Sequence, residues 1–143
     1  MKIILMAVLM LAGTLFAAGE APKEKYAVIL HAGAETNEAR ARAVHALLYA
    51  ADLAEHGHQV VLIFEGAGTG WVNELKRPEN PFRRHYLRIQ QLGVVEVVCD
   101  YCADAHDVKQ DLSKEQERLL VGDYEGHPSI TKWVEKGYRI IVL

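Results

Sequence analysis

Hydrophobic positions along the chain alternate between short continuous apolar runs and longer segments in which apolar residues recur every three or four positions. The runs are typical of strands buried on both faces of a parallel sheet. The longer spacing is typical of amphipathic helices that pack against such a sheet. The alternation predicts an α/β fold with an open, mostly parallel sheet of four to five strands flanked by helices. The predicted strands are Tyr26–His31, Gln59–Phe64, Val94–Val98 and Tyr138–Leu143.

The first predicted helix has the clearest pattern, because alanines line one face from Ala39 to Ala54. Small residues on that face allow a helix to lie close to a sheet. Thr36 or Asn37 can cap its amino end, and Gly57 can end it. A strand–helix–strand order of this kind is almost always right-handed, with the two strands parallel. The other predicted helices are Trp71–Lys76, Phe82–Leu92, Ser113–Leu120 and Pro128–Lys136.

A glycine-containing segment, Gly66–Gly70, follows the second predicted strand. It lacks the spacing of a dinucleotide-binding loop and the lysine of a phosphate-binding loop. A flexible loop beside a site is therefore the preferred interpretation. Trp71, Phe82 and Tyr86, which follow it, are candidate interface residues.

The first residues have the layout of a secretory signal peptide. Lys2 is followed by an apolar segment, and Ala17-Ala18-Gly19 supplies the small residues that precede a cleavage site. The alternatives are an uncleaved membrane anchor and a buried strand. The apolar segment is shorter than the roughly 20 residues that a spanning helix needs. We expect residues 1–19 to be a signal peptide, so that the mature protein is periplasmic or otherwise exported and has no membrane segment.

Residues 20–143 are then expected to form a single domain, as their length indicates. Half of the 143 residues are hydrophobic, which is enough for a sizeable core. The net charge is −3 and no basic patch stands out, which argues against nucleic-acid binding.

The two cysteines of the chain, Cys99 and Cys102, come directly after the third predicted strand. Open α/β sheets place their chemistry at the carboxyl ends of their strands. One interpretation is simple burial, since free cysteine is often a small core residue. A second is a nucleophilic thiol, whose thiolate needs a lowered pKa or a nearby base. Export would also permit a disulfide between them.

His31, at the end of the first predicted strand, and His106, four residues after Cys102, are the candidate bases for a thiol. Backbone N–H groups at the start of a following helix could stabilise the thiolate. Asp100, Asp104 and Asp107 would oppose this through their negative charge.

A metal site is the third interpretation. Cys99, Cys102 and His106 form a cluster of two thiolates and an imidazole, which suits zinc or copper(I). An aspartate, a distant histidine or water would have to supply a fourth ligand. No other cofactor is predicted.

The order of elements, and above all the segment Leu92-Gly-Val-Val-Glu-Val-Val-Cys99, resembles the DsrE/DsrF-like family over about residues 25–143. The resemblance implies a small α/β fold, homo-oligomers, and an active cysteine at Cys99. Members of that family that act in sulfur oxidation and transfer-RNA thiolation carry a persulfide on this cysteine and pass its sulfur to a partner protein.

The resemblance therefore implies a sulfur-carrier or sulfurtransferase-like role, with sulfur-donor and acceptor thiol proteins as partners. In this reading Cys99 holds the sulfur, Cys102 assists or resolves it, and His31 is a candidate base. The alternative is a non-catalytic oligomeric module in which the cysteines form a disulfide or, with His106, hold a metal.

Overall fold

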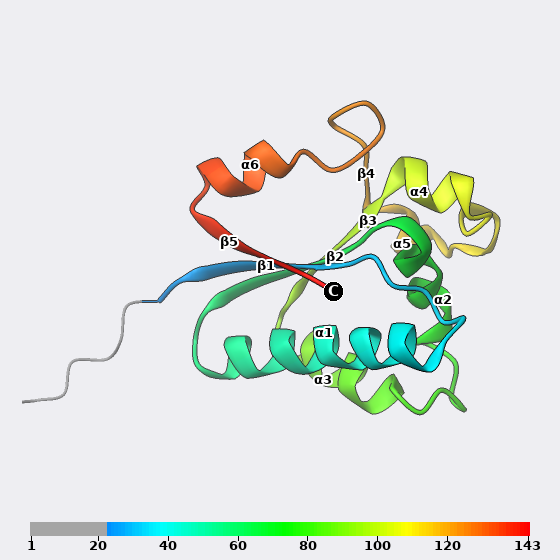
Figure 1. The fold of residues 1–143 in the computed structure, drawn as a ribbon, viewed down its shortest axis with the longest axis horizontal. Coiled ribbons are helices and arrows are strands. Elements are labelled where there is room, and N and C mark those ends of the chain that lie inside the picture. Colours follow the sequence, from blue (N-terminus) through cyan, green and yellow to red (C-terminus); the bar gives the residue numbers. More distant parts are fainter. Residues whose placement is uncertain (1–22) are drawn as a thin grey trace, which may run out of the picture.

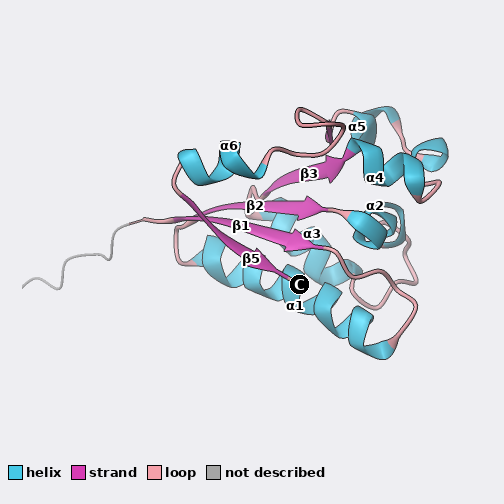
Figure 2. Ribbon diagram, turned by 45° about the horizontal axis from the view of Figure 1, so that its top comes forward, coloured by secondary structure: helices cyan, strands magenta, loops and turns pink. Residues whose placement is uncertain are grey.

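The computed structural model describes residues 23–143, and the predicted signal peptide lies outside the described residues. Five parallel strands form an open sheet in the order β4-β3-β2-β1-β5 (Figure 2). This confirms the predicted fold class. Within residues 23–143, no helix combines the length and the apolar character that crossing a membrane requires. The strands are β1 (Lys25–Leu30), β2 (Gln59–Phe64), β3 (Val95–Cys99), β4 (Leu120–Val121) and β5 (Tyr138–Val142).

Helices cover the two faces of the sheet unequally (Figure 1). The chain steps in one direction from β1 to β4 and then returns to the far side of β1 with β5. Right-handed crossovers that reverse direction place their helices on opposite faces. Accordingly α1 and α3 lie on one face and α6 on the other. The helices are α1 (Asn37–Glu55), α2 (Trp71–Glu74), α3 (Arg83–Gln91), α4 (Asp100–Ala105), α5 (Lys114–Glu117) and α6 (Ile130–Glu135), with 3-10 helices η1 (Gly66–Gly70) and η2 (Lys109–Asp111).

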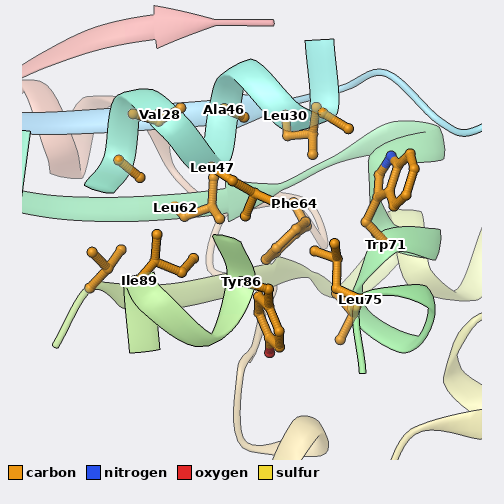
Figure 3. Close-up of a cluster of buried hydrophobic side chains, with 14 of the residues drawn as sticks. Val28, Leu30, Ala46, Leu47, Leu62, Phe64, Trp71, Leu75, Tyr86 and Ile89 are labelled. Atoms are coloured by element: carbon orange, nitrogen blue, oxygen red, sulfur yellow. The ribbon is translucent and has the colours of Figure 1, made fainter. Parts of the chain in front are cut away.

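Helix α1 begins and ends as its sequence predicts. Thr36 caps it by accepting a hydrogen bond from the N–H of Ala39 at 3.0 Å. Ala43, Ala46 and Ala50 are buried on its inner face, where their small side chains let the helix approach β1 and β2. Figure 3 shows how Leu47 of α1, Phe64 of β2 and the α3 residues fill this side of the sheet.

The other face has a smaller core. Alternate residues of the three central strands point to it, and Trp133 of α6 covers them together with Tyr138. Helix α6 has only six residues, and its Ile130 and Val134 are exposed. This face is therefore covered more thinly than the face beneath α1 and α3.

Two of the candidate interface residues belong to the core instead. Trp71 is buried, and its indole N–H is 3.0 Å from the carbonyl oxygens of both Ala32 and Gly33. Tyr86 is buried on α3 and donates its hydroxyl to the Glu96 carboxylate at 2.9 Å. Burial and the neighbouring carboxylate raise the pKa of the Tyr86 phenol. Hydrogen bonds for the polar atoms make burial of these large aromatic side chains favourable.

Two segments differ from the sequence-based expectation. The helix expected over Ser113–Leu120 ends at Glu117, and Leu120 and Val121 instead form β4. A two-residue strand has no periodicity that a sequence pattern could reveal. The expected flexible loop at Gly66–Gly70 is a 3-10 helix in which Gly68 and Thr69 are buried.

Gly68 fits η1 against the end of β1 and gives a test of this packing. A Cβ atom at Gly68 would stand 2.1 Å from the carbonyl oxygen of Leu30, whereas at Gly70 it would meet nothing within 4 Å. The Leu30 oxygen already accepts the N–H of Glu65, so it has little freedom to move. We expect Gly68→Ala to lower the free energy of unfolding by about 1–3 kcal/mol.

Gly70→Ala is the matched control and should be neutral or slightly stabilising. Urea unfolding followed by circular dichroism measures both variants. Equal stabilities for the two variants would contradict the packing described for η1.

Candidate functional site

The two cysteines lie at the junction of β3 and α4. Cys99 is the last residue of β3 and also the N-cap of α4, and its Sγ accepts the N–H of Cys102 at 3.2 Å. One helical turn brings Cys102 back over Cys99, so that their Cα atoms are 5.2 Å apart. The two sulfurs are joined as a disulfide. Cys99 has no exposed surface, and Cys102 is 9% exposed.

His127 completes the site. Its Nδ1 lies 3.3 Å from the Sγ of Cys99 and 3.7 Å from the Sγ of Cys102. Its ring also packs on Tyr101, with the ring centroids 4.8 Å apart. The imidazole is thus held between the disulfide and an exposed aromatic side chain, with its Nδ1 close to both sulfurs.

A tight turn fixes the position of His127. Tyr124 and His127 exchange backbone hydrogen bonds of 2.9 and 2.8 Å around Glu125 and Gly126. Both central residues have positive φ, 49° and 84°, as a type I′ turn requires. The carbonyl of Gly126 accepts the N–H of Tyr101 at 2.9 Å. The turn is therefore bonded directly to the first turn of α4.

Asp123 anchors the same segment from the other side. Its carboxylate accepts hydrogen bonds of 2.8 Å from the ammonium of Lys132 and from the N–H of Ser129. These two partners hold the pKa of the Asp123 carboxyl below its usual value. The segment that carries His127 is therefore tied to α6 as well as to α4.

The histidines proposed from the sequence lie elsewhere. His31 follows β1, which β2 separates from β3, and its Nε2 lies 3.0 Å from the Glu65 carboxylate. His106 is exposed at the end of α4, where its backbone N–H bonds to the Cys102 carbonyl at 3.0 Å. Among the described residues, the group of potential metal ligands consists of Cys99, Cys102 and His127. The structure therefore places His127 where the sequence-based metal cluster had His106.

The acidic residues around the cysteines are partly compensated. Asp100 forms an ion pair of 2.8 Å with Lys109, and this bond raises the pKa of Lys109. Asp104 and Asp107 are exposed to solvent, which screens their charge. The repulsion expected from these carboxylates is consequently weaker than the sequence alone indicates.

The arrangement distinguishes the two sulfurs chemically. A thiolate at Cys99 would keep the Cys102 N–H as a donor and would have His127 as its nearer imidazole neighbour. Hydrogen-bond donors favour the charged form of the group that they contact. Cys99 is therefore the sulfur that accepts a backbone N–H and lies nearer to the imidazole, and Cys102 is the more exposed residue of the two.

The chain belongs to the DsrE/DsrF-like family, whose model matches residues 24–143. It is 34% identical over 100 residues to an uncharacterized protein of Methanocaldococcus jannaschii, an alignment that covers 70% of this chain and 78% of that protein. Its fold is similar to the structure of a conserved protein of unknown function from Bacteroides thetaiotaomicron. That likeness has a TM-score of 0.59 at 17% identity and covers 84% of this chain and 95% of the other.

The turn that holds His127 can be tested at Gly126. An added Cβ there would stand 3.1 Å from the Cβ of Tyr101, and the positive φ adds strain of about 1–2 kcal/mol. Because the displaced turn would uncover the cysteines, we expect Gly126→Ala to speed reduction of the disulfide by dithiothreitol. Stopped reactions analysed by thiol alkylation give the rate.

Gly137→Ala is the control, because Gly137 has a similar φ of 82° but open space around its Cβ position. It should share the conformational strain and leave the reduction rate unchanged. Identical reduction rates in the wild type and both variants would show that the turn does not cover the pair.

Proposed function

We propose that this protein handles sulfane sulfur, carrying it as a persulfide on Cys99. The observation that supports this most directly is the pairing of Cys99 with two groups that favour its thiolate, the N–H of Cys102 and the imidazole of His127. Membership of the DsrE/DsrF-like family adds support, since the cysteine expected to be active in that family falls on the same residue.

Only the reduced protein can be loaded with sulfur, because in the disulfide the Cys99 sulfur is bonded to Cys102 and no thiolate is present to attack a donor. A dithiol reductant first converts the disulfide to two thiols. The Cys99 thiolate then attacks the outer sulfur of a hydropersulfide, forming Cys99–S–SH and releasing the donor as a thiolate. An acceptor thiolate takes that outer sulfur and regenerates the Cys99 thiolate, so no net oxidation occurs.

Cys102 offers a second outcome for the persulfide. Its thiolate can attack the Sγ of Cys99 and expel hydrosulfide, which forms the disulfide that the structure contains. His127, 3.7 Å from Cys102, is placed to accept the proton of that thiol. The pair would thereby discharge sulfur as sulfide when no acceptor thiol is present.

The experiment is sulfur loading of the full chain followed by intact mass. The protein is reduced, freed of reductant, exposed to inorganic polysulfide and analysed without reductant. We expect Cys102→Ser to gain at least one sulfur atom and to retain it, because no resolving thiol remains. The wild type should gain less sulfur and form disulfide, while Cys99→Ser should gain none.

Equal sulfur gain in Cys99→Ser and Cys102→Ser would contradict carriage on Cys99, as would the absence of any gain in Cys102→Ser. Alkylation of the product before mass analysis separates a true persulfide from sulfur adsorbed to the protein.

A second candidate function is a binding module whose disulfide is structural. The observation that favours it is the burial of the bonded pair between β3, α4 and the His127 turn. A loop this short contributes on the order of 2 kcal/mol by the chain-entropy model. Resistance of the native disulfide to mild reductant, together with destabilisation of that size in Cys99→Ser, would favour this function over carriage.

Export to an oxidising compartment, donor and acceptor thiol proteins, and assembly into homo-oligomers complete the proposal. Exposed Val134 on α6 and Val142 on the edge strand β5 are available for contacts between copies.

Export predicts a mature chain that begins at Glu20, because cleavage would follow Ala17-Ala18-Gly19. N-terminal sequencing of protein recovered from the producing cells measures this, and a retained Met1 would contradict cleavage.

A further inference from the structure

We propose that the reduced protein binds one Cu(I) ion through Cys99, Cys102 and His127. This goes beyond sulfur carriage and does not depend on it. The three donor atoms come from two segments, the β3–α4 junction and the Tyr124–His127 turn, and all lie within 4.8 Å of one another.

The position of His127 carries the proposal. A metal bonded to sulfur at about 2.3 Å and to nitrogen at about 2.0 Å, with bond angles between tetrahedral and trigonal, holds those two atoms about 3.5–3.7 Å apart. The Nδ1 of His127 lies 3.3 and 3.7 Å from the two sulfurs. The separation from Cys102 falls within this range, and the separation from Cys99 is slightly shorter than it. Only the two sulfurs have to move apart, which breaking their bond permits.

The donor set favours Cu(I) over other ions. Two thiolates and an imidazole are soft and intermediate ligands, and these select Cu(I) or zinc from the divalent and monovalent metals. Structural zinc sites are almost always four-coordinate. Within residues 23–143, the group contains three donors and no fourth His, Cys, Asp or Glu. Cu(I), a closed-shell ion, accepts three donors in a plane, so the set is complete for it.

The surroundings suit the charge that results. Cu(I) with two thiolates and a neutral imidazole carries one negative charge. The N–H of Cys102, 3.2 Å from the Sγ of Cys99, is a donor to that charge, and Lys109 already neutralises the adjoining Asp100 carboxylate. Burial of Cys99 and the Tyr101 ring against His127 also shield the ion from water.

Binding is confined to the reduced protein. A dithiol reductant supplies two electrons and two protons, which break the S–S bond and give two thiols while the reductant becomes a disulfide. Cu(I) then displaces one proton from each thiol, and the metal does not change oxidation state. Oxidation of the pair back to the disulfide removes both thiolates and would release the ion.

The experiment is an anaerobic competition titration of the reduced full chain with Cu(I) bicinchoninate, followed by X-ray absorption of the copper complex. We expect one Cu(I) per chain, with two sulfur atoms and one nitrogen in the first shell. His127→Ala should bind at least about tenfold more weakly, since even the loss of an outer-shell partner typically costs 10–100-fold. Its copper should be bound by two sulfurs alone.

His106→Ala is the matched control, because this histidine is nearer in sequence to the cysteines but lies outside the ligand group. It should bind as the wild type does, and the oxidised wild type should not bind. Thermal unfolding of the oxidised variants shows whether each is folded.

The proposal is overturned if the reduced wild type binds no Cu(I), if its first shell holds sulfur alone, or if His127→Ala retains the wild-type affinity. Because the assay contains no sulfane sulfur, its failure would leave sulfur carriage intact. Failure of polysulfide loading would equally leave the metal site intact.

Discussion

The parallel pairing of β4 with β3 is the contact on which the site depends. It joins only Val98 to Leu120 and Cys99 to Val121, yet it brings a segment 22 residues further along the chain beside the cysteines. The N–H of Val98 donates to the Leu119 carbonyl at 2.8 Å and starts this pairing. This pairing brings the chain to the end of β3, where the hydrogen bond from Tyr101 to Gly126 then holds the Tyr124–His127 turn.

A buried polar side chain positions the segment that leads into β4 for this pairing. Gln116, on α5, donates its amide to the Val72 carbonyl at 3.1 Å and to the Asn73 side chain at 2.9 Å. The same side chain closes a capping box with Ser113. The chain that leaves α5 is therefore held against α2 before it forms β4 and pairs with β3. A buried amide whose hydrogen bonds are all formed adds little to the net free energy of folding, but it fixes the path that the chain takes.

The sequence predicts the fold well because the fold follows from repeated local patterns. The apolar runs that became β1, β2, β3 and β5 and the alanine face of α1 each carry their own periodicity. The location of the cysteine pair at the end of a strand follows from the same pattern. His127 was missed because its approach to the cysteines depends on β4, which is too short to have a period, and on a turn set by Glu125 and Gly126. Proximity along the chain favoured His106, but the end of α4 leaves that side chain in solvent.

The disulfide, the proposed persulfide and the proposed Cu(I) complex exclude one another at this site. A disulfide uses one electron from each sulfur, a persulfide uses the lone pair of the Cys99 thiolate, and Cu(I) would use a lone pair from each of two thiolates. The same Cys99 Sγ takes part in all three, so occupancy of one state prevents the other two. The reduction potential of the surrounding thiol pool then decides whether either proposed activity is possible, since both begin with reduction of the same disulfide. His127 lies within 3.7 Å of both sulfurs, so its imidazole would neighbour the reacting sulfur atoms in each of these states.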